Sequence, residues 1–147
     1  MTEHFELKDG RLHGPYLTST DDGVPIMRAT FVDGQIDGPA QIYGPGGVLT
    51  QQLHFRAGVL EGESIMYSEG VPSAKLPYRS GVLEGEAVFL DEAGRVARRA
   101  TYAGGALSGP STEYYPDGHT REIQRFRANK LHGETTRFDE NGRVKER

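Results

Sequence analysis

The feature that most constrains this chain is a repeat of about 24 residues. Three glycine columns recur, and within each column the spacing is 24, 24, 23, 24 and 24 residues. The first column is Gly10, Gly34, Gly58, Gly81, Gly105 and then Asn129; the second is Gly14, Gly38, Gly62, Gly85, Gly109 and Gly133; the third is Gly23, Gly47, Gly70, Gly94, Gly118 and Gly142. This periodicity predicts one repeat domain, residues 1–147, with six units near 1–23, 24–47, 48–70, 71–94, 95–118 and 119–147. The one short interval lies between Gly62 and Gly70, inside repeat three.

Turn residues and strand-forming residues alternate within every unit. Asp-Gly and Asn-Gly pairs such as Asp9-Gly10, Asp33-Gly34 and Asn141-Gly142 are typical of hairpin turns, because glycine adopts the positive φ that these turns need. Runs of roughly 8 to 10 residues separate the turns, and they are rich in Val, Thr, Tyr and Phe. Each unit is therefore predicted to be a β-hairpin.

Six hairpins predict an all-β protein of twelve strands, or thirteen if residues 143–146 form a last short one. We expect a single elongated antiparallel meander sheet, twisted and curled, because open sheets of more than about ten strands rarely stay flat. Each repeat would contact only its neighbours. The second glycine falls in mid-strand, where it predicts a bend or the close approach of an aromatic ring from the next strand.

The composition favours a small protein without covalent staples. The chain has no cysteine, which excludes disulfides and fits a reducing, cytoplasmic environment. Its first residues, MTEHFELKDG, do not resemble a secretory signal. No apolar run approaches the ~20 residues needed to cross a membrane, so no stable membrane insertion is expected.

Charge is divided unevenly along the chain. Residues 1–94 contain 14 acidic and 6 basic side chains, whereas residues 95–147 contain 7 acidic and 11 basic ones. One interpretation is two solvated surfaces of opposite sign. The other is an acidic surface that steers a basic partner, because charge of one sign mainly raises the association rate and selects partners.

No arrangement of residues predicts catalysis, a cofactor or a metal. His13 and His132 share a repeat position but lie ten strands apart, and no spacing among the five histidines resembles a metal triad. The chain has no Gly-x-Ser-x-Gly nucleophile motif. Residues 44–47 and 139–142 are interpreted as turns, because the first lacks the Lys-Ser/Thr of a phosphate loop and the second lacks the alternating ligands of a calcium loop.

An acidic column is the strongest candidate for a partner-binding site. Asp37 lies one repeat before the paired motifs Glu61-Gly62-Glu63 and Glu84-Gly85-Glu86. Acid-base catalysis would need a pocket that shifts carboxyl pKa values, so a solvated stripe or a contact surface is the better interpretation. Tyrosine is enriched in interface cores, and three tyrosines near this column join the predicted contact set, with packing over the glycines as the alternative. They are Tyr43, Tyr67 and Tyr114.

A basic segment near the C-terminal end carries Arg121, Arg125, Arg127 and Lys130 around Phe126. Strand alternation predicts that the three arginines share one face, opposite Phe126. The acidity of the whole chain and the small size of the cluster favour a solvated or ion-pairing face over nucleic-acid binding.

Aromatic and leucine columns complete a recognisable pattern. Phe or Tyr stands three residues before the first glycine in repeats two to six, and Leu or Ile stands two residues after it. The pattern Phe/Tyr-x-x-Gly-x-Leu-x-Gly, then Tyr or Phe, then Asp/Asn-Gly resembles the variant MORN repeat, most closely in residues 55–70, 78–94 and 126–142. Ser19, Leu90 and Asn129 depart from it.

The resemblance implies a binding protein. Bacterial proteins with such repeats include the YwqK-type antitoxins, or immunity proteins, which implies stoichiometric binding of a cognate toxin with a basic surface. MORN proteins at large imply the alternative, a scaffold or membrane-associated interaction module. An enzyme is the least favoured of the three classes.

Overall fold

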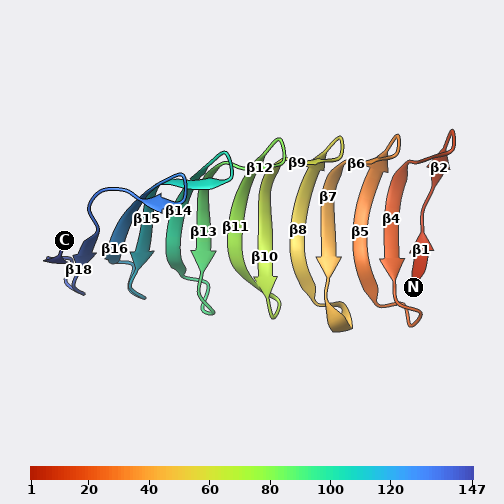
Figure 1. Ribbon diagram of the computed structural model, residues 1–147. Helices are drawn as coiled ribbons and strands as arrows, with labels where there is room; N and C mark the ends of the chain where they lie inside the picture. Colours follow the sequence, from red (N-terminus) through yellow and green to blue (C-terminus); the bar gives the residue numbers. More distant parts are fainter.

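The computed structural model describes residues 1–147, and nearly all of its regular structure is antiparallel strand (Figure 1). The strands are β1 (Thr2–His4), β2 (Leu7–Lys8), β3 (Arg11–Leu12), β4 (Gly14–Ser19), β5 (Pro25–Val32), β6 (Gln35–Ile36), β7 (Gly38–Tyr43), β8 (Leu49–Arg56), β9 (Val59–Leu60), β10 (Gly62–Ser68), β11 (Val71–Arg79), β12 (Val82–Leu83), β13 (Gly85–Leu90), β14 (Val96–Ala103), β15 (Ala106–Tyr114), β16 (Thr120–Arg127), β17 (Lys130–Leu131), β18 (Thr136–Phe138) and β19 (Val144–Glu146). A single 3-10 turn, η1 (Pro45–Gly47), lies between β7 and β8.

The long strands follow one another in chain order across one sheet. Pairing runs β1-β4-β5-β7-β8-β10-β11-β13-β14-β15-β16-β18-β19, and every pair is antiparallel. The termini therefore lie at opposite ends of a long, arched array, with all turns along its two margins (Figure 1). The prediction of an all-β meander of hairpins is confirmed.

The sheet has 17 strands, and β2 with β3 forms a separate two-stranded ladder. The number exceeds the predicted twelve or thirteen because the second glycine interrupts most second strands of the hairpins. Asp37, just before Gly38 (φ 90°), lies between β6 and β7, for example, and Glu61, just before Gly62 (φ 94°), lies between β9 and β10. When the segments around each interruption are joined, thirteen long strands remain, and β19 is the last.

Two kinds of turn occupy the two margins. At the first glycine column the turns have two residues, both at positive φ as type I′ hairpins require, such as Asp33 (48°) and Gly34 (85°); we name these the short turns. At the third column the turns are longer and only glycine has positive φ, except in repeat three, where Glu69 (51°) and Gly70 (80°) form a two-residue turn. In the turn after β4, Thr20 N–H donates to the Val24 carbonyl and Gly23 N–H donates to the Thr20 carbonyl. The pairing of β4 with β5 shifts register between Thr18 and Ser19, just before this turn. We therefore name the turns at the third column the bulged turns.

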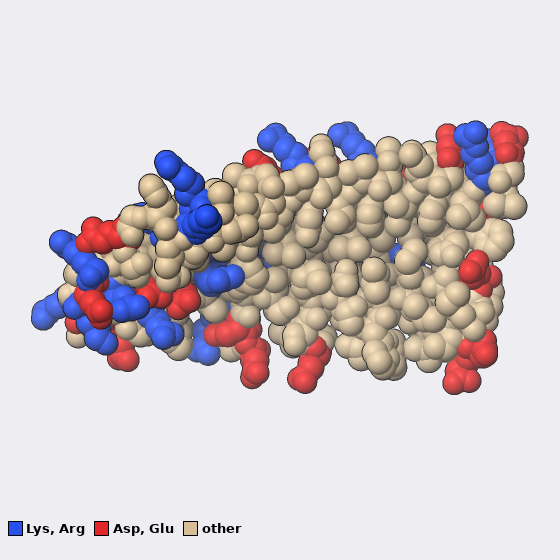
Figure 2. Space-filling view, viewed as in Figure 1, with Lys and Arg blue, Asp and Glu red and all other residues tan.

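The molecule is one sheet thick, so it has no enclosed core. Only 9 of 147 residues are buried, and all of them are alanine, serine or threonine. Ala40, Ser64, Ala87 and Ala100 lie on one face, which we name the apolar face, where larger neighbours such as Leu53, Leu76 and Phe89 cover them. The large side chains themselves remain half-buried. Figure 2 shows a broad uncharged surface over the middle strands, with Lys and Arg gathered toward the C-terminal end.

Candidate protein-interaction surface

The opposite face of the sheet, here named the polar face, carries an unbroken row of side chains across eleven strands. Strand pairing aligns Leu17, Arg28, Gln41, Gln52, Ile65, Lys75, Val88, Arg99, Thr112, Ile123 and Thr136. The Gln41 side-chain amide donates to Gln52 Oε1 at 3.2 Å. The row mixes amides, cations and apolar side chains, which is the composition of a polar protein interface.

Five of the eight predicted contact residues lie on this polar face. Strand alternation places Glu63 and Tyr67 beside Ile65, and it places Glu86 beside Val88. Tyr43 and Tyr114 follow Gln41 and Thr112 in the same way. The five side chains therefore border the central row.

The two carboxylates on this face differ in whether they pair with another group of the chain. Glu63 is exposed and makes no hydrogen bond or ion pair within the chain. Glu86 accepts from Arg99 Nη1 at 2.9 Å, and both side chains are about half exposed. Glu63 is thus free to contact another molecule, whereas Glu86 would have to exchange Arg99 for a partner's cation.

The other three predicted residues, Asp37, Glu61 and Glu84, have a structural task that the sequence did not reveal. Each stands just before the second glycine, and we name this place in the repeat the cap position. Its carboxylate accepts a hydrogen bond from the first N–H of the next short turn. Ala57 N–H donates to Asp37 Oδ1 at 2.8 Å, and Ser80 N–H donates to Glu61 Oε2 at 2.6 Å. Gly104 N–H donates to Glu84 in the same way.

The cap position is occupied by a hydrogen-bond acceptor throughout the array. Asp33 N–H donates to His13 Nδ1 at 3.3 Å, and Ala128 N–H donates to Ser108 Oγ at 3.2 Å. A two-residue turn leaves this N–H without a partner in its own hairpin, so the preceding repeat must supply the acceptor. One residue type in all six repeats would have revealed the cap position as a motif. Here the residues share only the capacity to accept a hydrogen bond.

A second hydrogen bond joins each short turn to the repeat before it. The N–H of the second turn residue donates to the carbonyl of the Leu/Ile column, as in Gly34 to Leu12 (2.8 Å), Gly58 to Ile36 (2.8 Å) and Gly81 to Leu60 (2.8 Å). Gly105 and Asn129 repeat the contact with Leu83 and Leu107. Each short turn is therefore tied to its neighbour by one side-chain bond and one backbone bond.

The tyrosines do not cover the mid-strand glycines, so that interpretation is wrong. Strand pairing places the Phe or Tyr that stands three residues before the first glycine opposite these mid-strand glycines. Gly38 faces Phe55, and Gly62 faces Tyr78. Tyr67 instead faces Pro72, beside a bulged turn. A methyl group built on Gly38 or Gly62 would meet nothing within 4 Å. Glycine is needed there for its positive φ, and no ring occupies the space of the missing side chain.

The basic segment lies on the polar face near the C-terminal end. Arg125 faces Pro110 across the ladder, and alternation places Arg121 and Arg127 with it, as predicted. A hollow of about 600 Å³ lies here, and Arg125, Arg127 and His132 are among its lining residues. Arg125 Nη1 also donates to the Glu134 carbonyl at 3.0 Å.

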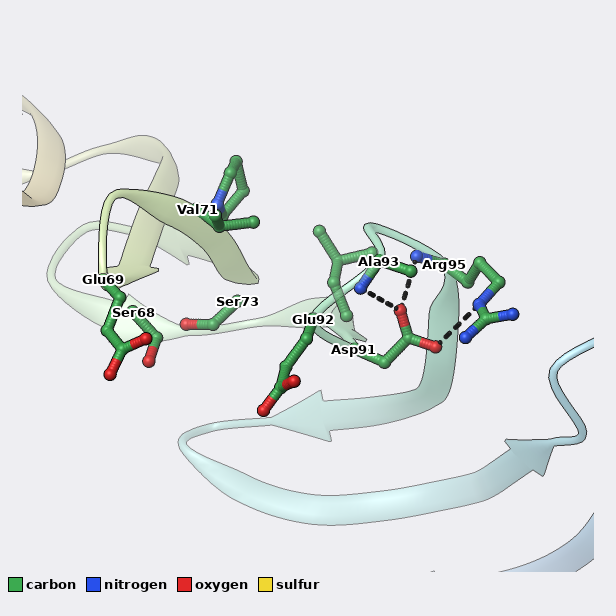
Figure 3. A pocket seen from close by; sticks show the side chains of 10 residues that line it. Ser68, Glu69, Val71, Ser73, Asp91, Glu92, Ala93 and Arg95 are labelled. Atoms are coloured by element: carbon green, nitrogen blue, oxygen red, sulfur yellow. Dashed lines mark hydrogen bonds and ion pairs between the residues drawn. The ribbon is translucent and has the colours of Figure 1, made fainter.

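A second hollow lies between the bulged-turn ends of repeats three and four (Figure 3). It has a volume of about 850 Å³ and is lined by Ser68, Glu69, Val71, Pro72, Ser73, Leu90, Asp91, Glu92, Ala93 and Arg95; we name it the groove. Asp91 Oδ1 accepts from the N–H groups of Ala93 and Arg95, and Oδ2 accepts from Arg95 Nε. The Arg95 N–H bond is the main cause that lowers the pKa of Asp91.

Glu69 and Glu92 were not among the predicted contact residues. In contrast to Asp91, neither of them pairs with a cation or accepts a hydrogen bond within the chain. The 23-residue interval ends at Gly70, next to Glu69, and is the one sequence signal that could have drawn attention to this turn.

The structure brings no set of three or more His, Cys, Asp or Glu side chains together in a way that could hold a metal ion. His13 and His132 lie in β-hairpins at the two ends of the sheet. No helix is long and apolar enough to cross a membrane.

One comparison with known proteins bears on the repeat itself. The family described as MORN repeat variant matches residues 131–147, a stretch that contains β18, β19 and the bulged turn between them. The glycine columns place the five preceding copies in register with the matched one, and all six fold as hairpins. No curated protein matches the chain.

Proposed function

We propose that the protein is a cytoplasmic antitoxin or immunity protein that neutralises a cognate bacterial toxin by direct, stoichiometric binding. The observation that carries the proposal is the open sheet: two broad faces lie uncovered, and the polar face gathers Glu63, Glu86 and three tyrosines around one continuous row. Aromatic anchors surrounded by polar groups are the usual composition of a specific protein interface.

Charge supports a basic partner. The acidic excess of residues 1–94 extends over the N-terminal two thirds of the sheet, where it would raise the rate of encounter with a cationic surface. A toxin that acts on nucleic acid presents such a surface. The proposal therefore predicts that the affinity falls as the ionic strength rises.

Co-expression with the product of the neighbouring gene tests the proposal. The two proteins should co-purify as a complex with a fixed ratio of subunits, and cells that carry both should grow where cells with the neighbour alone do not. A neighbour that is harmless, or that passes through an affinity column loaded with this protein, would contradict the proposal.

The alternative is a scaffold or membrane-associated interaction module, which the MORN repeat variant at residues 131–147 favours in general terms. Sedimentation with vesicles that contain anionic lipid separates the two functions. The antitoxin proposal predicts that the acidic chain stays in the supernatant, whereas a membrane-associated module would pellet with the vesicles.

A further inference from the structure

The bulged turn of repeat three is shorter than all the others. Ser68 pairs directly with Val71, and the two residues between them, Glu69 (φ 51°) and Gly70 (φ 80°), form a type I′ turn. The corresponding turn of repeat four has one residue more: Asp91 N–H donates to the Arg95 carbonyl, and Gly94 N–H donates to the Asp91 carbonyl. The residue missing from the 23-residue repeat is thus missing from this turn.

The close packing of the turns along that margin ends at this deletion. A methyl group on Gly47 would lie 3.2 Å from Val24 Cγ1, and one on Gly70 would lie 3.7 Å from Val48 Cγ1, so the first three turns pack against one another. A methyl group on Gly94, Gly118 or Gly142 would meet nothing within 4 Å. The stack therefore ends at the third turn, and the groove lies between the third turn and the fourth.

The groove combines an apolar wall with free negative charge. Val71, Pro72 and Leu90 line it, and Glu69 and Glu92 stand on its two sides (Figure 3). Asp91 and Arg95 neutralise each other through their 3.0 Å ion pair, so a net charge of −2 remains from the two glutamates. Neither a neutral apolar ligand nor an anion would match this arrangement.

We propose that the groove receives an arginine or lysine side chain from a loop of the protein partner. Such a side chain has a methylene stem that packs against apolar surface and a cationic head that stays near carboxylates. Val71, Pro72 and Leu90 would contact the stem, and Glu69 and Glu92 would pair with the head. The identity of the ligand as a protein rests on the proposed function, whereas the preference for a cation with an aliphatic stem rests on the groove alone.

The groove can be tested without the partner. The probe is N-acetylarginine amide, titrated into the 15N-labelled full-length protein, with the neutral N-acetylcitrulline amide as its match in shape. We expect saturable shifts of the Glu69, Val71, Leu90 and Glu92 amide signals with the arginine compound and none with the citrulline compound. Equal shifts with both compounds, or no shift with either, would overturn the proposal.

Variants separate the groove from general acidity. E69Q/E92Q should weaken arginine binding at least about fivefold, because both carboxylates that face the cation are neutralised. E140Q changes the residue that corresponds to Glu92 in the bulged turn of repeat six and should leave the affinity unchanged. An unchanged affinity in E69Q/E92Q would overturn the proposal.

Insertion of one Asn between Glu69 and Gly70 restores a repeat of 24 residues and reproduces the Glu-Asn-Gly order of residues 140–142. The longer turn should fill the groove, so the variant should fold with an unchanged circular dichroism spectrum and lose the arginine-dependent shifts. Retention of those shifts would place the site elsewhere. If arginine binds here while the neighbouring gene product does not bind the protein, the proposed function fails and the cation site stands.

Discussion

A single side chain at the cap position links each repeat to the next. Asp37, Glu61 and Glu84 looked like one acidic contact stripe in the sequence, and exposed carboxylates would be expected to tolerate charge reversal. Their bonds to the next short turn give them a role in stability that the sequence did not indicate. Sequence periodicity could not show this, because the donor lies about 20 residues ahead and becomes a neighbour only when the turns stack.

Removal of one cap should therefore destabilise the fold. Glu61→Ala leaves the Ser80 N–H without its acceptor and should lower the free energy of unfolding by about 1 kcal/mol, as loss of a helix cap does. Glu61→Gln keeps an oxygen acceptor and should cost less. The matched control is Glu63→Ala, two residues away on the polar face, which should change stability by less than about 0.5 kcal/mol. Urea unfolding of the three variants measures the difference, and equal losses for positions 61 and 63 would contradict the cap.

Removal of a buried hydroxyl on the apolar face should raise the free energy of unfolding, in contrast to removal of a cap. Ser64 is 1% exposed and its Oγ has no hydrogen-bond partner, while the corresponding positions of the repeats on either side are Ala40 and Ala87. Ser64→Ala removes an unpaired polar atom from a site that alanine already fits, so it should raise the free energy of unfolding by about 1 kcal/mol. Thermal unfolding would detect the gain. A clear loss of stability would mean that the hydroxyl is satisfied in solution.

The hairpin is the element that the glycine columns predicted correctly. Two of these columns mark the two turn margins, and the spacing gave both the number of long strands and their order. The pattern did not distinguish the two turn types, because Asp9-Gly10 and Asp22-Gly23 look alike as dipeptides but differ in whether the aspartate has positive φ. The second glycine was predicted to mark a bend or the approach of an aromatic ring, but the break in the strand was not predicted, since alternation of side chains continues on both sides of it.

The bulged turns should make stability depend on pH. Hydrogen bonds lower the pKa of Asp91 below its ordinary 3.8, chiefly the one from the Arg95 N–H, and the pKa of Asp139 is lowered in the same way by the Arg143 N–H. A lowered folded-state pKa adds stability above the ordinary value, and this contribution is lost as the pH falls through the folded value. Asp91→Asn should thus be less stable than the wild type at neutral pH, and the two should converge as the pH falls below the lowered pKa of Asp91. A stability difference that stays constant between those two conditions in urea unfolding would contradict this account.

At the scale of the whole molecule, stability is spread evenly along a chain of neighbours. Five of the eight predicted contact residues came together on the polar face because strand alternation is regular across the repeats. The sequence placed the missing residue between Gly62 and Gly70, but it could not show a groove there, since the groove depends on how the neighbouring turns pack.

Removal of one complete repeat tests the modular stability. Deletion of residues 95–118 joins Gly94 to His119 and preserves the form of the bulged turn. The shortened protein should keep its β-sheet circular dichroism spectrum, because repeats four and six become neighbours and the other repeats keep the neighbours that they had. X-ray scattering should report a molecule shorter by two strands, about 9.6 Å. Global unfolding of the shortened chain would show that the repeats are not interchangeable units.

The central claim is that the open polar face binds a basic protein. The most direct test is the affinity of the E63K/E86K variant for the neighbouring gene product, measured by calorimetry beside the wild type. Neither glutamate caps a short turn, so the fold should persist, and the account predicts that binding weakens at least about tenfold through like-charge repulsion. An affinity equal to that of the wild type, in a variant with unchanged thermal stability, would contradict it.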